Sequence, residues 1–371
     1  MRPMRWREAA VAIAALFVVT RGALVLIALF LENNIPLEHR GPSYATGPLL
    51  TSLTGTDSVY LLGIAAEGYH AEPVRQLFRD WAFFPLYPLV TRAVSILTLG
   101  NVAVAGVLVA NLAFVGALAV LYRLSINHLD HDRAVRSLAF VALAPGAVAF
   151  AMAYTDSLFL LLAASAFLAA EQRRWALMAL LYGLATLTRL QGVLLAIPLA
   201  ILIADQAGGW RTAVGWRTPR LLWLAAGPIA FALFAAYLGW AFGDPLGMFT
   251  AQRAWSQIGQ EPIGPVTPVL DRFDPIVLLL VGVLCLYLFL FVFRRLDRLP
   301  AAYTALALVT VVTALASGRL QSIGRYLAVA WPFGWLLANR RAAWFELTGL
   351  AAFAALFVVH AVLHFTQALA P

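Results

Sequence analysis

Long apolar stretches, separated by short segments rich in Arg, dominate the pattern of the chain. About 20 helical residues cross the ~30 Å hydrocarbon core of a bilayer, so such stretches are typical of transmembrane helices. Eleven of them can be delimited, at about 9–31, 101–122, 137–155, 157–170, 174–188, 190–204, 221–243, 275–293, 299–318, 323–338 and 342–366. The pattern predicts an all-α, polytopic membrane protein in which residues 1–371 form one integral membrane domain.

The distribution of Arg predicts the orientation. With the N-terminus in the cytoplasm, sixteen Arg lie in cytoplasmic loops, nine lie outside and Arg21 lies within the first span. Counting the apolar stretch 82–100 as a further span would leave eight inside against sixteen outside, contrary to the positive-inside rule. We therefore interpret 82–100 as a re-entrant or partly buried piece of an outer loop.

Two long outer loops follow from this orientation, at 32–100 and 244–274. The first is too apolar to be disordered, and the segment that begins at Asp57 predicts a helix in the membrane interface. The second carries four prolines that indicate irregular backbone. Loops of such length are usually functional when they are ordered.

Composition narrows the class of protein. The chain is 62% apolar and 12% charged, whereas soluble domains are about 45–50% apolar and about 25% charged. All 26 basic residues are Arg and they are spread over the loops, so the net charge of +8 indicates membrane topology rather than nucleic-acid binding. We expect the membrane to be a prokaryotic plasma membrane. A single cysteine, Cys285, excludes a disulfide framework. The chain has no Walker A motif, which argues against a nucleotide substrate.

Several charged residues lie at the outer ends of apolar runs. Ionisable groups at such depths are functional candidates. Arg189, Arg319 and Arg325 could bind a phosphate if they converge, because the guanidinium fork matches phosphate oxygens. Asp57 and Asp156 precede helical runs and could instead be plain helix caps, and Arg189 could instead extend to the interface.

The histidines do not predict a metal site. His39, His70, His360 and His364 lack the spacing and the further ligands that a metal would need. We therefore expect no metal cofactor.

Five motifs follow one another along the chain. They are TDSVYLLGIAAEGY from Thr56, WAFFPLYPL from Trp81, LAPGAVAFAMAYTDSLFLLL from Leu143, LATLTRLQGVLL from Leu184 and GRYLAVAWPF from Gly324. Together they resemble the PIG-V family of lipid-linked mannosyltransferases, which is part of the GT-C superfamily of membrane glycosyltransferases. The resemblance covers residues 55–200 well and 318–338 more weakly. Thr56 stands where the family usually has Trp, and Asp156 where Glu is common.

This resemblance implies a GT-C-like bundle whose long first external loop carries the catalytic carboxylate, Asp57. It implies an inverting transfer of mannose from a polyprenyl-phosphate donor to a hydroxyl of a glycan or glycolipid acceptor outside the membrane. Arg189, Arg325 and Arg319 are then expected to bind the donor phosphate. The residues expected to contact the acceptor or to support the site are Asp156, Tyr154, Glu67, Tyr69 and His70.

Two other functions remain open from the sequence. A GT-C transferase could use another lipid-phosphate-linked sugar, such as glucose, arabinofuranose or an aminosugar, with the same fold. A lipid-linked sugar flippase or transporter would instead place its substrate site near the bilayer midplane. The candidate residues gather on the outer side, which favours an enzyme.

Overall fold

The computed structural model describes residues 5–35, 42–74, 79–214, 220–258, 299–316, 320–338 and 343–366. The described residues form helices, and one isolated antiparallel bridge joins Ser43 to Gly55. The α-helices and 3-10 helices (η) are α1 (Trp6–Asn34), α2 (Leu50–Leu53), α3 (Ser58–Glu67), η2 (Asp80–Ala82), α4 (Leu86–Ser95), α5 (Val102–Ser125), α6 (His131–Ala142), η3 (Pro145–Phe150), α7 (Asp156–Glu171), α8 (Trp175–Thr186), η4 (Leu190–Leu195), α9 (Ala196–Gln206), α10 (Trp210–Ala213), η5 (Arg220–Ala225), α11 (Ala226–Phe242), α12 (Gly247–Ile258), α14 (Ala301–Ala316), α15 (Leu320–Ala328), α16 (Pro332–Ala338) and α17 (Ala343–Phe365). Arg319, His39, Cys285, the run 275–293 and residues 259–274 lie outside the described part.

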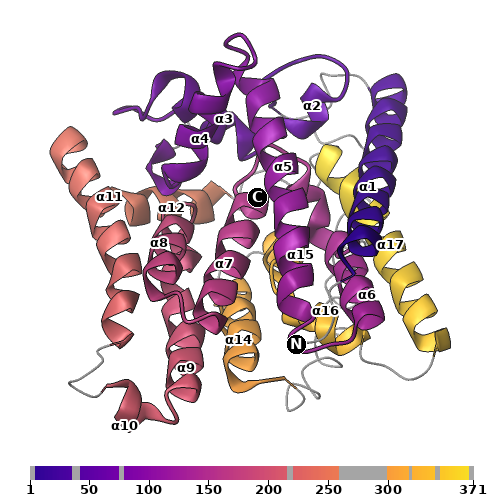
Figure 1. Cartoon of the computed structure of the whole chain (residues 1–371). Helices are drawn as coiled ribbons and strands as arrows, with labels where there is room; N and C mark the ends of the chain where they lie inside the picture. Colours follow the sequence, from indigo (N-terminus) through magenta and orange to yellow (C-terminus); the bar gives the residue numbers. More distant parts are fainter. Residues whose placement is uncertain are drawn as a thin grey trace.

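Four of the described helices are long and apolar enough to cross a membrane. They are Trp6–Asn34, Val102–Ser125, Arg220–Phe242 and Leu347–Phe365. The longer helices run roughly parallel, with α2, α3 and α4 at one end of the bundle and α10 at the other (Figure 1). This arrangement is that of an integral membrane protein; the eleven crossings and the orientation remain predictions.

Small side chains hold the centre of the bundle together. Helices α5, α7 and α8 pack side by side, and the faces in contact are rich in buried alanine. Small residues let helix backbones approach closely, which membrane helices use in place of a hydrophobic driving force. The stacked rings of Phe114 and Phe150, 4.9 Å apart, fill the space where α5 meets η3.

Two of the predicted spans are not continuous helices. The run 137–155 comprises the end of α6, then η3 and a non-helical turn, and the run 323–338 divides into α15 and α16. The interruptions coincide with Pro145 and Pro332, because proline lacks a backbone N–H and disfavours helical geometry at the residue before it. Irregular backbone at such depth is tolerated where it is enclosed by protein or lines a cavity. The turn at 151–155 does lie in the protein interior, since all five of its residues are buried.

The helix that follows Asp57 is more enclosed than an interfacial helix would be. Seven of the ten residues of α3 are buried, and α3 packs against α4 and α5. Helix α4 is ten residues long, about 15 Å, which is too short to cross the bilayer. Its location in a re-entrant or outer segment remains a prediction.

Candidate active site

Four charged side chains from distant parts of the sequence form one line of ion pairs. Arg325 Nη1 donates to Asp57 Oδ2 at 2.7 Å, and Arg325 Nε lies 3.3 Å from Asp156 Oδ2. Arg189 Nη1 donates to Asp156 Oδ1 at 2.6 Å. Asp57, Asp156 and Arg189 are all buried. The order Asp57, Arg325, Asp156, Arg189 alternates negative and positive charge, and we call these four residues the charge relay cluster.

Asp57 is located at the start of α3 but does not cap it. It takes the N-cap position, yet its side chain accepts no capping hydrogen bond and reaches Arg325 instead. Its second oxygen, Oδ1, is buried and accepts no hydrogen bond from the described residues. A helix cap therefore does not explain this residue, and one carboxylate oxygen is left for another partner.

Arg189 is held in an extended turn between α8 and η4. Its backbone has φ −166° and ψ 151°, and its carbonyl accepts the N–H of Gly192 at 2.9 Å. A side chain at Gly192 would collide with the backbone of Thr186, so the turn requires glycine. The Arg189 guanidinium lies over the rings of Phe159 and Tyr326, at 5.6 and 5.4 Å. These contacts direct the side chain into the bundle, which argues against the alternative that Arg189 extends to the interface.

Arg325 is located by the close approach of α15 to η3. Gly146 of η3 lies directly against the backbone of Gly324 and Arg325, and a Cβ at Gly146 would collide with both. This contact lets α15 carry the Arg325 guanidinium to both carboxylates. The pairs formed there are buried on both sides, with 15% of the Arg325 side chain and 7% of the Asp57 side chain exposed.

Tyr154 packs against this cluster. The Arg325 guanidinium sits 4.6 Å from the centre of the Tyr154 ring. The Tyr154 hydroxyl pairs with Thr56 and lies 3.1 Å from His364 Nε2. Thr56 adopts φ 53°, a left-handed conformation that is costly for a β-branched residue. Strain of this kind concentrates at functional sites, which is the signal that could have drawn attention to Thr56.

The other predicted site residues form a second group. His70 Nδ1 pairs with Asp80 Oδ2 at 2.9 Å and His70 Nε2 with Glu67 Oε2 at 3.0 Å. The Tyr69 hydroxyl donates to the carbonyl of Phe83 at 2.7 Å. The hydrogen bond to Asp80 raises the pKa of His70, and burial raises the pKa of Asp80. None of these contacts involves the charge relay cluster.

Sequence reasoning missed Asp80 and passed over His364. Asp80 immediately precedes the WAFFPLYPL motif, which could have singled it out. Local sequence gives no reason to select His364, because its hydrogen-bond partner Tyr154 lies 210 residues away. Arg319 lies outside the described residues, so its predicted role in phosphate binding is not placed.

Stability alone does not explain a cluster of three buried charges and one largely buried charge, that of Arg325. Well-packed apolar residues often stabilise a protein as much as a buried ion pair does, because desolvation of the charges offsets their attraction. Ionisable groups at such positions in membrane proteins are by default functional candidates. The cluster is therefore the candidate active site.

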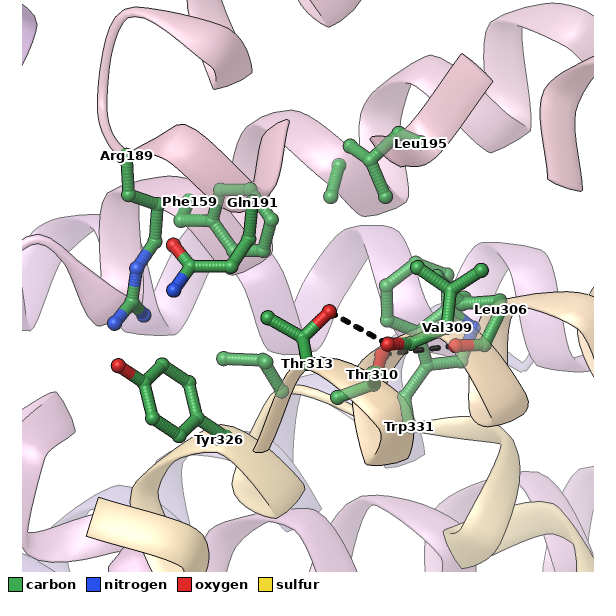
Figure 2. Close-up of a pocket in the computed structure, with 12 residues that line it drawn as sticks. Phe159, Arg189, Gln191, Leu195, Leu306, Val309, Thr310, Thr313, Tyr326 and Trp331 are labelled. Carbon is green, nitrogen blue, oxygen red and sulfur yellow. Dashed lines mark hydrogen bonds between the residues drawn. The ribbon is translucent and has the colours of Figure 1, made fainter. Parts of the chain in front are cut away.

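A narrow pocket runs from this cluster into the bundle. Figure 2 shows Arg189 and Tyr326 at one end of it and Trp331 at the other. Its wall is mainly apolar, because Thr310 and Thr313 turn their hydroxyls back to carbonyls of their own helix.

Comparison with known proteins gives one family match. Residues 42–205 match the family model described as Mannosyltransferase (PIG-V). The chain is similar to that family over these residues, which are less than half of its length. The match includes Asp57, Asp156 and Arg189, whereas Arg325 lies beyond it. It confirms the resemblance inferred from the motifs.

Solved structures similar to this chain include the archaeal oligosaccharyltransferase AglB from Archaeoglobus fulgidus in complex with an inhibitory peptide and a dolichol-phosphate. That structure has a TM-score of 0.47 at 12% identity, over 96% of this chain and 56% of that one. The apo form of the Archaeoglobus fulgidus oligosaccharyltransferase has a TM-score of 0.46 at 12% identity, with the same coverage. The chain thus spans about half the length of these structures. No curated protein matches it in sequence.

Side chains that could bind a metal ion do not cluster in the described part of the chain. No set of three or more His, Cys, Asp or Glu residues there could hold a metal ion. Function without a metal cofactor remains a prediction.

Gly146 gives a first test of the site geometry. We expect Gly146→Ala to separate α15 from η3 and to abolish most activity, because the new methyl group collides with backbone that cannot rotate away. Gly22→Ala in α1 is the matched control, since nothing lies within 4 Å of its Cβ position. Sugar transfer and thermal unfolding of both variants check this, and an active Gly146→Ala protein would contradict it.

Proposed function

We propose that the protein is an inverting GT-C-like glycosyltransferase. It transfers mannose from a polyprenyl-phosphate-mannose donor to a hydroxyl of a glycan or glycolipid acceptor, on the external side of a prokaryotic plasma membrane with the N-terminus in the cytoplasm. The family match supports the reaction class. The observation that carries the proposal is the buried Oδ1 of Asp57 in the charge relay cluster, which has no hydrogen-bond partner among the described residues.

Asp57 acts as the general base. The acceptor hydroxyl donates to Oδ1, and its oxygen attacks the anomeric carbon of mannose. A carbon–oxygen bond to the acceptor forms as the bond to the lipid phosphate breaks, and the hydroxyl proton passes to Oδ1. One displacement inverts the configuration. Asp57 suits this role because Arg325 holds its other oxygen at 2.7 Å and so orients the free one.

Arg189 and Arg325 stabilise the leaving phosphate. Arg189 uses Nη1 to bind Asp156, which leaves its Nε and Nη2 donors for phosphate oxygens. Both guanidinium groups lie in a buried region, where fixed charges stabilise developing negative charge more strongly than in water. Asp156 orients the two guanidinium groups, since it contacts both of them.

The pocket beside Arg189 supports a lipid-linked donor. Its apolar wall includes Phe159, Leu195, Leu306 and Val309. A polyprenyl chain is pure hydrocarbon and needs no hydrogen-bond partners there. A phosphate at Arg189 and a chain in the pocket would place the anomeric carbon next to the cluster.

A donor panel tests the proposed function. The purified protein in lipid nanodiscs is given polyprenyl-phosphate-linked mannose, glucose, arabinofuranose or an aminosugar, with an alkyl mannoside as acceptor. We expect transfer from the mannose donor with release of polyprenyl phosphate, and a large loss of turnover in Arg189→Lys, which keeps the charge but loses the fork. Transfer from another sugar alone would reassign the donor. Movement of the intact donor across the bilayer without bond cleavage would identify a transporter instead.

A further inference from the structure

Arg21 is a cation in the middle of the first membrane helix that has no acidic partner in the described part of the chain. It lies on α1, 29 residues long, and among the described residues no carboxylate pairs with it. Its guanidinium lies 4.3 Å from the centre of the Phe114 ring of α5, so it faces the protein rather than the lipid. A cation at this depth is costly, which requires an explanation other than solubility.

The guanidinium binds backbone and amide oxygens instead. Arg21 Nη2 donates to the carbonyl of Phe150 at 2.8 Å, and Arg21 Nε donates to Asn111 Oδ1 at 2.8 Å. The Asn111 amide in turn donates from Nδ2 to the carbonyl of Ala151 at 3.1 Å. Arg21 thus holds two successive carbonyls, one directly and one through Asn111.

These two carbonyls belong to the end of η3 and the turn that follows it. The turn at 151–155 has no helical hydrogen bonds of its own to satisfy them, so a buried donor is needed. A further hydrogen bond joins the turn to α2, because the N–H of Ala153 donates to the carbonyl of Leu53 at 2.9 Å. The turn leads directly to Tyr154 and Asp156, which contact Arg325 and Arg189. Its position decides where the charge relay cluster lies.

We propose that Arg21, with Asn111, is a positioning residue of the active site: it fixes the turn at 151–155 and thereby sets the location of Asp156 and Tyr154. This inference rests on the proposed function for its effect on turnover, while its effect on the turn is independent of the reaction. An apolar residue at position 21 would leave the carbonyl of Phe150 with only the Ser157 hydroxyl, at 3.0 Å. A shift of about 1 Å in catalytic groups can lower a rate by about 10²-fold.

The test compares Arg21→Met and Arg21→Lys with the unmodified protein, in nanodiscs. Hydrogen–deuterium exchange of peptides covering 150–156 reports on the turn, and kcat per folded molecule reports on the site. We expect Arg21→Met to speed exchange at 150–156 and to lower kcat about 10- to 100-fold. Arg21→Lys retains a cation for the carbonyl of Phe150 but loses the fork that binds Phe150 and Asn111 through two nitrogens, so its kcat should lie between the two.

Two further variants keep the test decisive. Asn111→Leu removes only the link to Ala151 and should give a smaller change of the same kind, even if Arg21→Met fails to fold. Leu24→Ala leaves a cavity on the same helix but removes no hydrogen bond to η3 or the turn, since Leu24 is buried and its side chain is apolar. It should lower thermal stability while kcat and exchange at 150–156 stay unchanged.

The outcomes separate the two proposals. Unchanged exchange at 150–156 together with unchanged kcat in Arg21→Met would overturn the positioning role. It would also be overturned if Leu24→Ala changed exchange at 150–156 and kcat in the same way as Arg21→Met. If the unmodified protein transfers no sugar from any donor, the proposed function fails. In that case faster local exchange in Arg21→Met still supports the link between Arg21 and the turn, and unchanged exchange overturns it.

Discussion

Asp57→Asn is expected to lower the rate of sugar transfer by about 10²–10⁴-fold, which is the contribution of a general base, while the protein remains folded. The amide has the size of the carboxylate and still accepts a hydrogen bond from Arg325, but it cannot take the proton of the acceptor hydroxyl. Transfer by the purified variant, together with its thermal unfolding, measures both properties.

Asp156→Asn is the informative comparison for this variant. Both carboxylates contact Arg325, and each has one buried oxygen without a hydrogen-bond partner among the described residues, Asp57 Oδ1 and Asp156 Oδ2. Asp156 Oδ2 nevertheless lies 3.3 Å from Arg325 Nε, and Asp156 Oδ1 accepts from Arg189, so both Asp156 oxygens face guanidinium groups. We expect Asp156→Asn to weaken donor use chiefly through KM, since it orients Arg189 and Arg325. A fully active, stable Asp57→Asn protein would remove Asp57 from the mechanism and make Asp156 the next carboxylate to consider.

Arg325→Met is expected to have the largest effect on stability. Removing one partner of a buried ion pair costs about 3–5 kcal/mol, because the remaining charge is left uncompensated. Arg325 lies between two carboxylates, so its loss leaves both Asp57 and one side of Asp156 without a cation. Turnover should also fall sharply, since the phosphate loses one of its two cations. Thermal or denaturant unfolding in detergent, with donor turnover, checks this.

A double variant distinguishes the ion pairs from simple packing. Neutralising Asp57 removes one of the two uncompensated charges, so Arg325→Met should cost less in an Asp57→Asn background than alone. Arg211→Met is the matched control on an exposed arginine of α10, and its effect should be within about 0.5 kcal/mol. Equal costs of Arg325→Met in both backgrounds would contradict the coupling of Asp57 and Arg325.

The sequence alone determined the class of the protein and its family resemblance. Apolar runs and scarce charge leave a membrane bundle as the only way to bury so much apolar surface, and the five motifs carried the family resemblance that the match over 42–205 confirms. Asp57, Asp156, Arg189 and Arg325 could be selected because charged groups at the ends of apolar runs are costly without a function, whereas Tyr154 followed only from the family resemblance.

Only the tertiary structure decided how these residues meet. Hydropathy is averaged over a window of residues, so it predicts 137–155 and 323–338 as continuous transmembrane helices. In the structure, Pro145 and Pro332 interrupt the helices in these runs. The pairing of Arg325 with Asp57 joins residues 268 apart. It depends on the contact between Gly146 and Gly324, for which no local pattern exists. Long-range contacts of this kind are set by helix packing, and periodicity along the chain carries no information on which helices are neighbours.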